Sequence, residues 1–152
     1  MRDRDGPYVE AVETFSFAGN ASYAYTADQY RREKVIVGRI TVVCDATVAN
    51  RYPYFLYRDS GSNIVYAPPI PNVAMTAGQT KYVDMVNNSN QCSYTDRAVT
   101  ASQQNAILDV PDLWLEGSGG LRMVFACSGG VAGDTVSVRL VVKKYMGTAG
   151  VI

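Results

Sequence analysis

An alternation of apolar and polar residues near the end of the chain constrains the fold most strongly. In the segment 135–143, aliphatic side chains occupy every second position, and polar or charged side chains occupy most of the others. Successive side chains of a β-strand point to opposite faces, so this period of two predicts a strand that is buried on one face. The segment 121–127 alternates in the same way. The Val- and Ile-rich segment 35–44 predicts a central strand buried on both faces.

Shorter strands are expected between these segments. The turn-forming run 58–63 predicts a hairpin between strands at 52–57 and 64–66. Two further short strands, bounded by Gly, Asn and Pro, are expected at 81–86 and 105–110, and 113–115 is a short element that ends at a glycine turn. Many short strands separated by turn residues are typical of a sandwich or barrel. We therefore expect an all-β fold: an antiparallel β-sandwich of jelly-roll-like type with an extended N-terminal arm.

The length of 152 residues suits one domain, which we divide into an arm (1–33), a sandwich domain (34–146) and a tail (147–152). The arm shows no sustained period, and only 26–34 could form a helical turn or two. Disordered segments are usually poor in aromatic residues, so the aromatic side chains of the arm need a surface to pack on. That surface is either the chain's own sheet or a neighbouring subunit. The expected partner-binding residues are Tyr8, Phe15, Phe17, Tyr23, Tyr25 and Tyr30. Deletion of residues 1–30 is expected to leave the sandwich folded and to weaken assembly.

Catalytic chemistry has little support in the sequence. The chain contains no histidine, so Ser-His-Asp and Cys-His arrangements cannot be built within it. Asp109, Asp112 and Glu116 are the nearest candidates for an acid–base pair, and we interpret them as loop carboxylates. No calcium-loop or zinc-type spacing occurs, and the glycine-rich segments 117–120 and 128–133 predict hairpin turns rather than phosphate loops. We expect no enzymatic activity, catalytic residue, metal, cofactor or small-molecule substrate.

Charge and hydropathy narrow the range of partners. Fourteen basic and fourteen acidic residues leave a formal net charge of zero, which disfavours nucleic acid and favours association between copies. No apolar run approaches the roughly 20 residues that span a bilayer, and the N-terminus lacks the apolar segment of a signal peptide. We expect a homo-oligomer that is made in the cytoplasm, with no membrane partner. Cys44 and Cys127 are expected to be buried thiols, and Trp114 either a core anchor or an interface residue, with the core favoured.

From about residue 35 to 145 the chain resembles the small β-sandwich virion structural proteins of tailed bacteriophages. The resemblance rests on VANR at 48–51, FLYRDSG at 55–61, AGQ at 77–79, LWL at 113–115 and AGDTVS at 132–137. It implies a capsid cement or decoration protein that binds the major capsid protein or other virion proteins as a dimer or trimer at the capsid surface in the virion, after synthesis in the host cytoplasm. The family brings no catalytic residues. Two alternatives stay open: a carbohydrate- or receptor-binding module, and a head-to-tail connector or tail adaptor.

Overall fold

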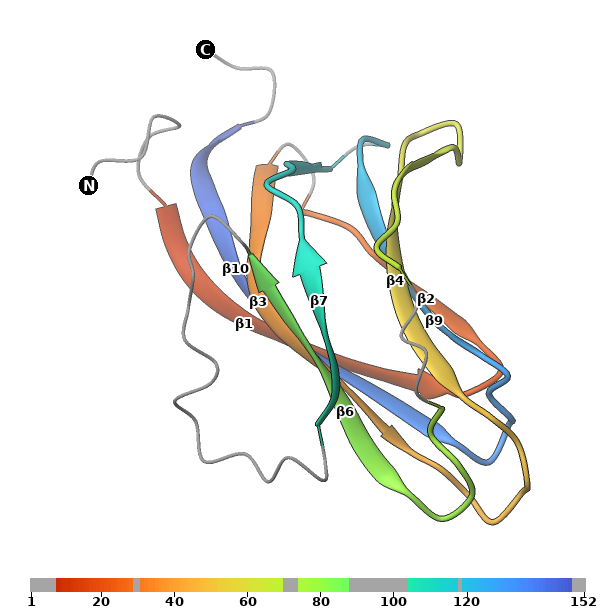
Figure 1. The fold of residues 1–152 in the computed structure, drawn as a ribbon. Coiled ribbons are helices and arrows are strands. Elements are labelled where there is room, and N and C mark those ends of the chain that lie inside the picture. The colour runs from red at the N-terminus through yellow and green to blue at the C-terminus, as the bar shows by residue number, and fades with distance from the viewer. Residues whose placement is uncertain (1–7, 29–30, 70–73, 88–103, 118, 149–152) are drawn as a thin grey trace.

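The strands of the protein form two sheets that pack face to face (Figure 1). The computed structural model describes residues 8–28, 31–69, 74–87, 104–117 and 119–148. In spatial order the first sheet contains β1 (Tyr8–Ala18), β10 (Thr135–Thr148), β3 (Arg31–Val43), β6 (Thr80–Asn87) and β7 (Gln104–Val110), and β8 (Leu115–Glu116) also pairs with β3. The second sheet contains β2 (Ser22–Tyr25), β9 (Arg122–Ser128), β4 (Tyr52–Arg58) and β5 (Ile64–Tyr66).

The prediction of an all-β antiparallel sandwich is confirmed, with one parallel pair as the exception. Among the described strands, β6 and β7 form a parallel pair, and the other neighbours run antiparallel. No helix occurs in the described ranges; of the segment 26–34, residues 26–28 are irregular, 31–34 belong to β3, and 29–30 lie outside the described residues. Within these ranges no helix is therefore long and apolar enough to cross a membrane.

Alternation accounts for the two long strands at the centre of the first sheet. In β10 the side chains from Val136 to Val142 that share its inner face are buried, whereas Arg139 is exposed. The same alternation holds in β3, where Ile40 is buried and Arg39 lies on the partly exposed outer face. Burial on both faces, as predicted for 35–44, is therefore limited to the start of the strand, where an irregularity in register opposite Val141 and Val142 interrupts the alternation.

The predicted arm requires a correction, because its described part lies within the two sheets. β1 pairs with β10 from Tyr8 opposite Tyr145 to Ala18 opposite Thr135, and β2 pairs with β9 in the second sheet. The reason is that alternate residues of β1 pack against the buried cluster between the sheets, so the aromatic residues find their surface within the chain itself. Tyr30 lies outside the described residues.

The core lies between the sheets and is dominated by aliphatic, aromatic and methionine side chains. Phe55, Phe125, Met75, Met123 and Leu115 are all fully buried there. The predicted burial of Cys44 and Cys127 is confirmed, and both are free thiols. Burial raises the pKa of Cys44 and, with a smaller contribution from the nearby Asp134 carboxylate, raises the pKa of Cys127 to about 12.

The turns of the chain agree only in part with the predictions. The hairpin across 58–63 is confirmed, since β4 pairs with β5. The glycine-rich segments 117–120 and 128–133 are not hairpins, because each joins a strand of the first sheet to β9 in the second. At the second crossing a Cβ on Gly130 would come within 2.1 Å of the carbonyl oxygen of Gly19. The glycine therefore allows a backbone approach that any side chain would block.

Candidate functional site

An aromatic cluster closes the side of the sandwich on which β1 and β2 are the edge strands. The ring of Phe15 stacks on that of Tyr23 with 4.0 Å between centroids and 12° between planes. Phe15 also lies 6.0 Å from Tyr25 and meets Phe125 of β9 edge-on at 5.3 Å. Phe17 adds a further stacked contact with Tyr23 at 6.5 Å. Each such ring pair stabilises the fold by about 0.5–1.5 kcal/mol beyond the effect of its buried area. Because its rings come from both sheets, the cluster holds the edge of one sheet against the edge of the other.

Four of the six residues expected to bind a partner therefore come together: Phe15, Phe17, Tyr23 and Tyr25. Tyr8 lies at the opposite end of β1, with its ring 5.6 Å from that of Tyr145. Tyr25 is buried, whereas Tyr8 and Tyr23 are 36% and 38% exposed. Among the described residues of this set, Tyr8 and Tyr23 thus offer the most surface to a second molecule.

Polar groups fix the chain between β2 and β3 behind this cluster. The hydroxyl of Tyr25 donates to Oε1 of the buried Glu33 over 2.5 Å, and the backbone N–H of Asp28 donates to Oε2 over 2.9 Å. Burial and, next, the Glu33 carboxylate raise the pKa of Tyr25 far above its ordinary value. Lys144 of β10 pairs with Glu13 of β1 over 2.6 Å and lies 4.0 Å from Glu33. This cluster ties β1 and the β2–β3 connection to β10.

The outer edge of β1 is a second exposed feature. β1 spans eleven residues, and no described strand pairs with its outer edge. Tyr8, Val9 and Val12 expose 36%, 49% and 51% of their surface along it. An edge strand with free backbone N–H and C=O groups can pair with a strand of another chain. We refer to the outer edge of Tyr8–Ala18, with these three side chains, as the β1 edge.

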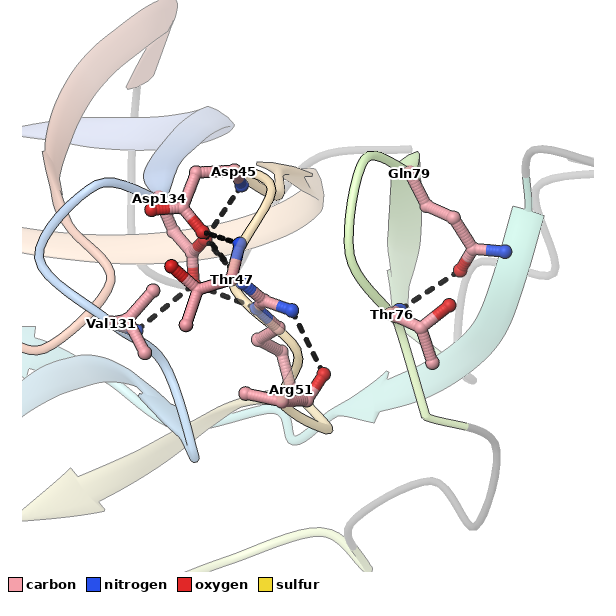
Figure 2. A network of polar contacts seen from close by, with 8 residues as sticks. Asp45, Thr47, Arg51, Thr76, Gln79, Val131 and Asp134 are labelled. Atoms are coloured by element: carbon pink, nitrogen blue, oxygen red, sulfur yellow. Dashed lines mark hydrogen bonds and ion pairs between the residues drawn. The ribbon is translucent and has the colours of Figure 1, made fainter.

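A buried ion-pair network holds together the β3–β4 loop and the β9–β10 loop at one end of the sandwich (Figure 2). Arg51 donates to the carboxylate of Asp134 and, from Nη2, to Oδ1 of Asp45 over 3.0 Å. Asp134 also accepts hydrogen bonds from the backbone N–H groups of Asp45 and Val131. Desolvation would raise the pKa of Asp134, but these hydrogen bonds outweigh it and hold the pKa at about 2. A carboxylate held ionised in this way stabilises loops and is unsuited to proton transfer.

Trp114 combines features of the two roles considered for it, a core anchor and an interface residue. Its indole is half-buried and meets the buried Tyr145 edge-on at 4.4 Å. Lys34 places Nζ 4.2 Å from the ring centroid, and the guanidinium of Arg32 lies 4.6 Å away. These cation–π contacts and the Tyr145 contact anchor the segment before β8 on the first sheet.

The candidate acid–base residues are not arranged as a catalytic pair. Asp109, Asp112 and Glu116 are all exposed, and Asp112 forms an ion pair with Lys34 over 3.1 Å. Within the described ranges, no group of three or more His, Cys, Asp or Glu residues could hold a metal ion. The Arg51 network was not foreseen from the sequence, because its members come from positions 45, 51 and 134 without a common motif.

Comparisons with known proteins place the chain only distantly. No protein-family model and no curated protein matches it. A structure of the Gx strain of infectious bursal disease virus is similar over 93% of this chain and 39% of the viral chain, with 11% identity and a TM-score of 0.32. The T13 particle of the same virus is similar over 92% and 36%, with 11% identity and a TM-score of 0.33. The chain thus spans less than two-fifths of those proteins, and similarity at this level says nothing about what it binds.

Proposed function

We propose that the protein is a non-enzymatic structural protein of a virion, a capsid cement or decoration protein that binds and stabilises the head shell of a tailed bacteriophage. The β1 edge is the observation that carries this proposal. A long edge strand with exposed apolar side chains favours aggregation of a free monomer, and in an assembly the same strand can pair with a partner. The zero net charge agrees with this role, because it leaves little repulsion between copies.

The partners in this proposal are the major capsid protein or other virion proteins, and a second or third copy of the chain. Many copies of one modest contact on a regular lattice hold strongly together, because each further attachment is effectively intramolecular. Tyr8 belongs to the β1 edge, and Tyr23 would extend the contact to the exposed part of the aromatic cluster. The proposed partner-binding set remains Tyr8, Phe15, Phe17, Tyr23, Tyr25 and Tyr30.

Co-sedimentation with purified phage head shells tests the proposal, with light scattering to measure the mass of the free protein. We expect a dimer or trimer that saturates the shells and raises the temperature at which they rupture. Val9→Lys, which places a charge on the β1 edge, should weaken both self-association and shell binding. Val48→Lys is the matched control, since Val48 is 93% exposed in a loop. A protein that stays in the supernatant with every shell would overturn the proposal.

A carbohydrate- or receptor-binding module is the second candidate, and Tyr23 is the observation that favours it. Its ring is partly exposed and is held flat against Phe15, as a platform for stacking a sugar would be. Glycan-array binding that is lost in Tyr23→Ala, by a protein that does not sediment with shells, would favour this candidate over the first.

A further inference from the structure

A hollow with both polar and apolar lining lies on the outer face of the first sheet, away from the core and next to the β1 edge. It has a volume of about 640 Å³ and is formed by β1, β10 and β3. Side chains directly opposite each other on paired antiparallel strands lie on the same face of a sheet. The strand register therefore shows which side chains share this hollow.

Three rows of side chains cross the hollow at right angles to the strands. The first row is aliphatic and contains Val141 and Val37, with Val12 beside them at the rim; the second contains Thr14, Arg139 and Arg39; the third contains Ser16, Ser137 and Thr41. Neighbouring rows are two residues apart along each strand, which is about 7 Å. The face thus changes from apolar to cationic to hydroxyl-bearing along the strand direction.

The two arginines of the middle row differ in their partners. Arg39 donates from Nε to Oδ1 of the buried Asp84 over 2.8 Å, and its guanidinium covers the ring of Tyr82 at 3.9 Å. Arg139 is exposed, and within the described part of the chain it forms no hydrogen bond or ion pair. The guanidinium of Arg39 is therefore held in place by Asp84 and Tyr82, whereas the guanidinium of Arg139 can bind an anion from outside the chain.

Arg139 lies directly opposite Arg39, and like charges directly across a strand pair destabilise a sheet; the ion pair of Arg39 with Asp84 offsets only part of this repulsion. An anion bound between them would relieve this repulsion. A guanidinium matches a carboxylate in bidentate geometry, and hydrogen bonds to charged groups stabilise by about 1.5–3 kcal/mol. The Ser and Thr hydroxyls beside it can donate to the same anion or to its neighbours.

We propose that this hollow binds an extended acidic segment of a partner protein, with a carboxylate side chain on Arg139, an aliphatic side chain over the valine row and a small polar side chain over the hydroxyl row. Alternate side chains of an extended segment are also about 7 Å apart, so one face of it matches all three rows. This inference rests on the proposed function, because an assembly protein is what brings a partner polypeptide to the sheet. A stacked sugar fits less well, since the ring of Tyr82 is covered by Arg39.

The test is an NMR titration of the ¹⁵N-labelled protein with a capped seven-residue peptide. The peptide carries valine, glutamate and serine at its second, fourth and sixth positions and threonine elsewhere. We expect saturable shift changes confined to β1, β10 and β3, and binding about ten-fold weaker when glutamine replaces the glutamate. Arg139→Glu should abolish the changes and Arg139→Gln should weaken binding. Lys81→Glu is the matched charge reversal outside the hollow and should bind like wild type.

Each alternative outcome decides against the proposal in a distinct way. The absence of saturable shifts, or full binding by Arg139→Glu, would overturn it. Glucuronate or inorganic phosphate that binds at the same residues when the peptide does not would assign the hollow to a sugar or a free anion. Co-sedimentation separates this inference from the proposed function. If Arg139→Glu binds shells as wild type does, the hollow has no part in shell binding and only the inference about the hollow is overturned. If wild type does not sediment with shells but binds the peptide through Arg139, only the proposed virion role is overturned.

Discussion

Arg51 donates two hydrogen bonds to the carboxylate of Asp134, from Nε to Oδ2 over 2.9 Å and from Nη2 to Oδ1 over 3.0 Å. Both side chains are fully shielded from solvent, and 83 positions separate them in the sequence. A buried pair of this kind is costly to break, because the remaining partner keeps its charge without compensation. The pair therefore determines how the loops before β4 and before β10 are held.

Arg51→Met should lower the free energy of unfolding by about 3–5 kcal/mol, because it leaves the Asp134 carboxylate buried and unpaired. Arg51→Met combined with Asp134→Leu should cost less than the sum of the two single changes. Urea unfolding measures each value. Asp45→Asn is the control, because the Asp45 side chain is 30% exposed and its loss should cost much less. A loss below about 1 kcal/mol in Arg51→Met would contradict this interpretation.

Stability should fall in acid as Asp134 takes up a proton. Its pKa is about 2 in the folded protein against an ordinary value of 3.8, so the unfolded chain binds the proton more readily. The resulting stabilisation, about 2 kcal/mol, is complete above the unfolded pKa and disappears as pH falls towards 2. Urea unfolding at about pH 5.5 and pH 2.5 measures the loss, and Asp134→Asn should show a smaller pH dependence by that amount. Equal pH dependence in the two proteins would refute the assignment.

Tyr57→Phe should stabilise the protein. Within the described residues the buried Tyr57 hydroxyl has no hydrogen-bond partner, and burial raises the pKa of this tyrosine far above its ordinary value. Removal of the hydroxyl avoids its desolvation cost and keeps the ring contact with Phe55, so thermal unfolding should reveal a gain of about 1 kcal/mol. Tyr25→Phe is the matched control and should destabilise, because its hydroxyl donates to Glu33. A loss in Tyr57→Phe would indicate a partner for its hydroxyl.

Truncation of residues 1–25 should unfold the sandwich, contrary to the expectation drawn from the sequence for residues 1–30. The truncation removes β1 and β2, and with them the aromatic contact of Phe15 with Phe125 and the cover over the edge of β10. Circular dichroism and the cooperativity of thermal unfolding measure the effect. Removal of residues 1–7 leaves both strands intact and is the control. A cooperatively folded 26–152 fragment would restore the original interpretation of the arm.

The part of the fold that could be predicted is the part in which burial follows local alternation. Val136 to Val142 in β10 repeat every two residues, and that repeat alone indicates the strand and its inner face. β1 carries the same signal at Phe15 and Phe17, but Glu13 occupies the same face and interrupts the apolar pattern. The charge is tolerated there because it pairs with Lys144, a contact that no local pattern can reveal.

The composition of the candidate sites was harder to predict than the fold, because it depends on which strands become neighbours. Nothing near Arg139 in the sequence indicates that Arg39 lies opposite it. The residues of the aromatic cluster were identified as a group, yet the sequence left open whether they pack on the chain itself or on a neighbouring subunit. The pairing of β1 with β10 and of β2 with β9 answers that question for the described residues.

The pairing of β1 with β10 also determines when the protein can fold during its synthesis. β1 can pair with β10 only after β10, which begins at Thr135, has been synthesised. Tyr8 therefore cannot contact Tyr145 until the ribosome has produced the residues between them. Contacts this distant in sequence form slowly, because a long loop must close before they contribute. Until then β1 is an unpaired nascent strand. In general, a strand that stays unpaired for longer has more opportunity to pair with another copy of the chain, which is the route to exchanged dimers.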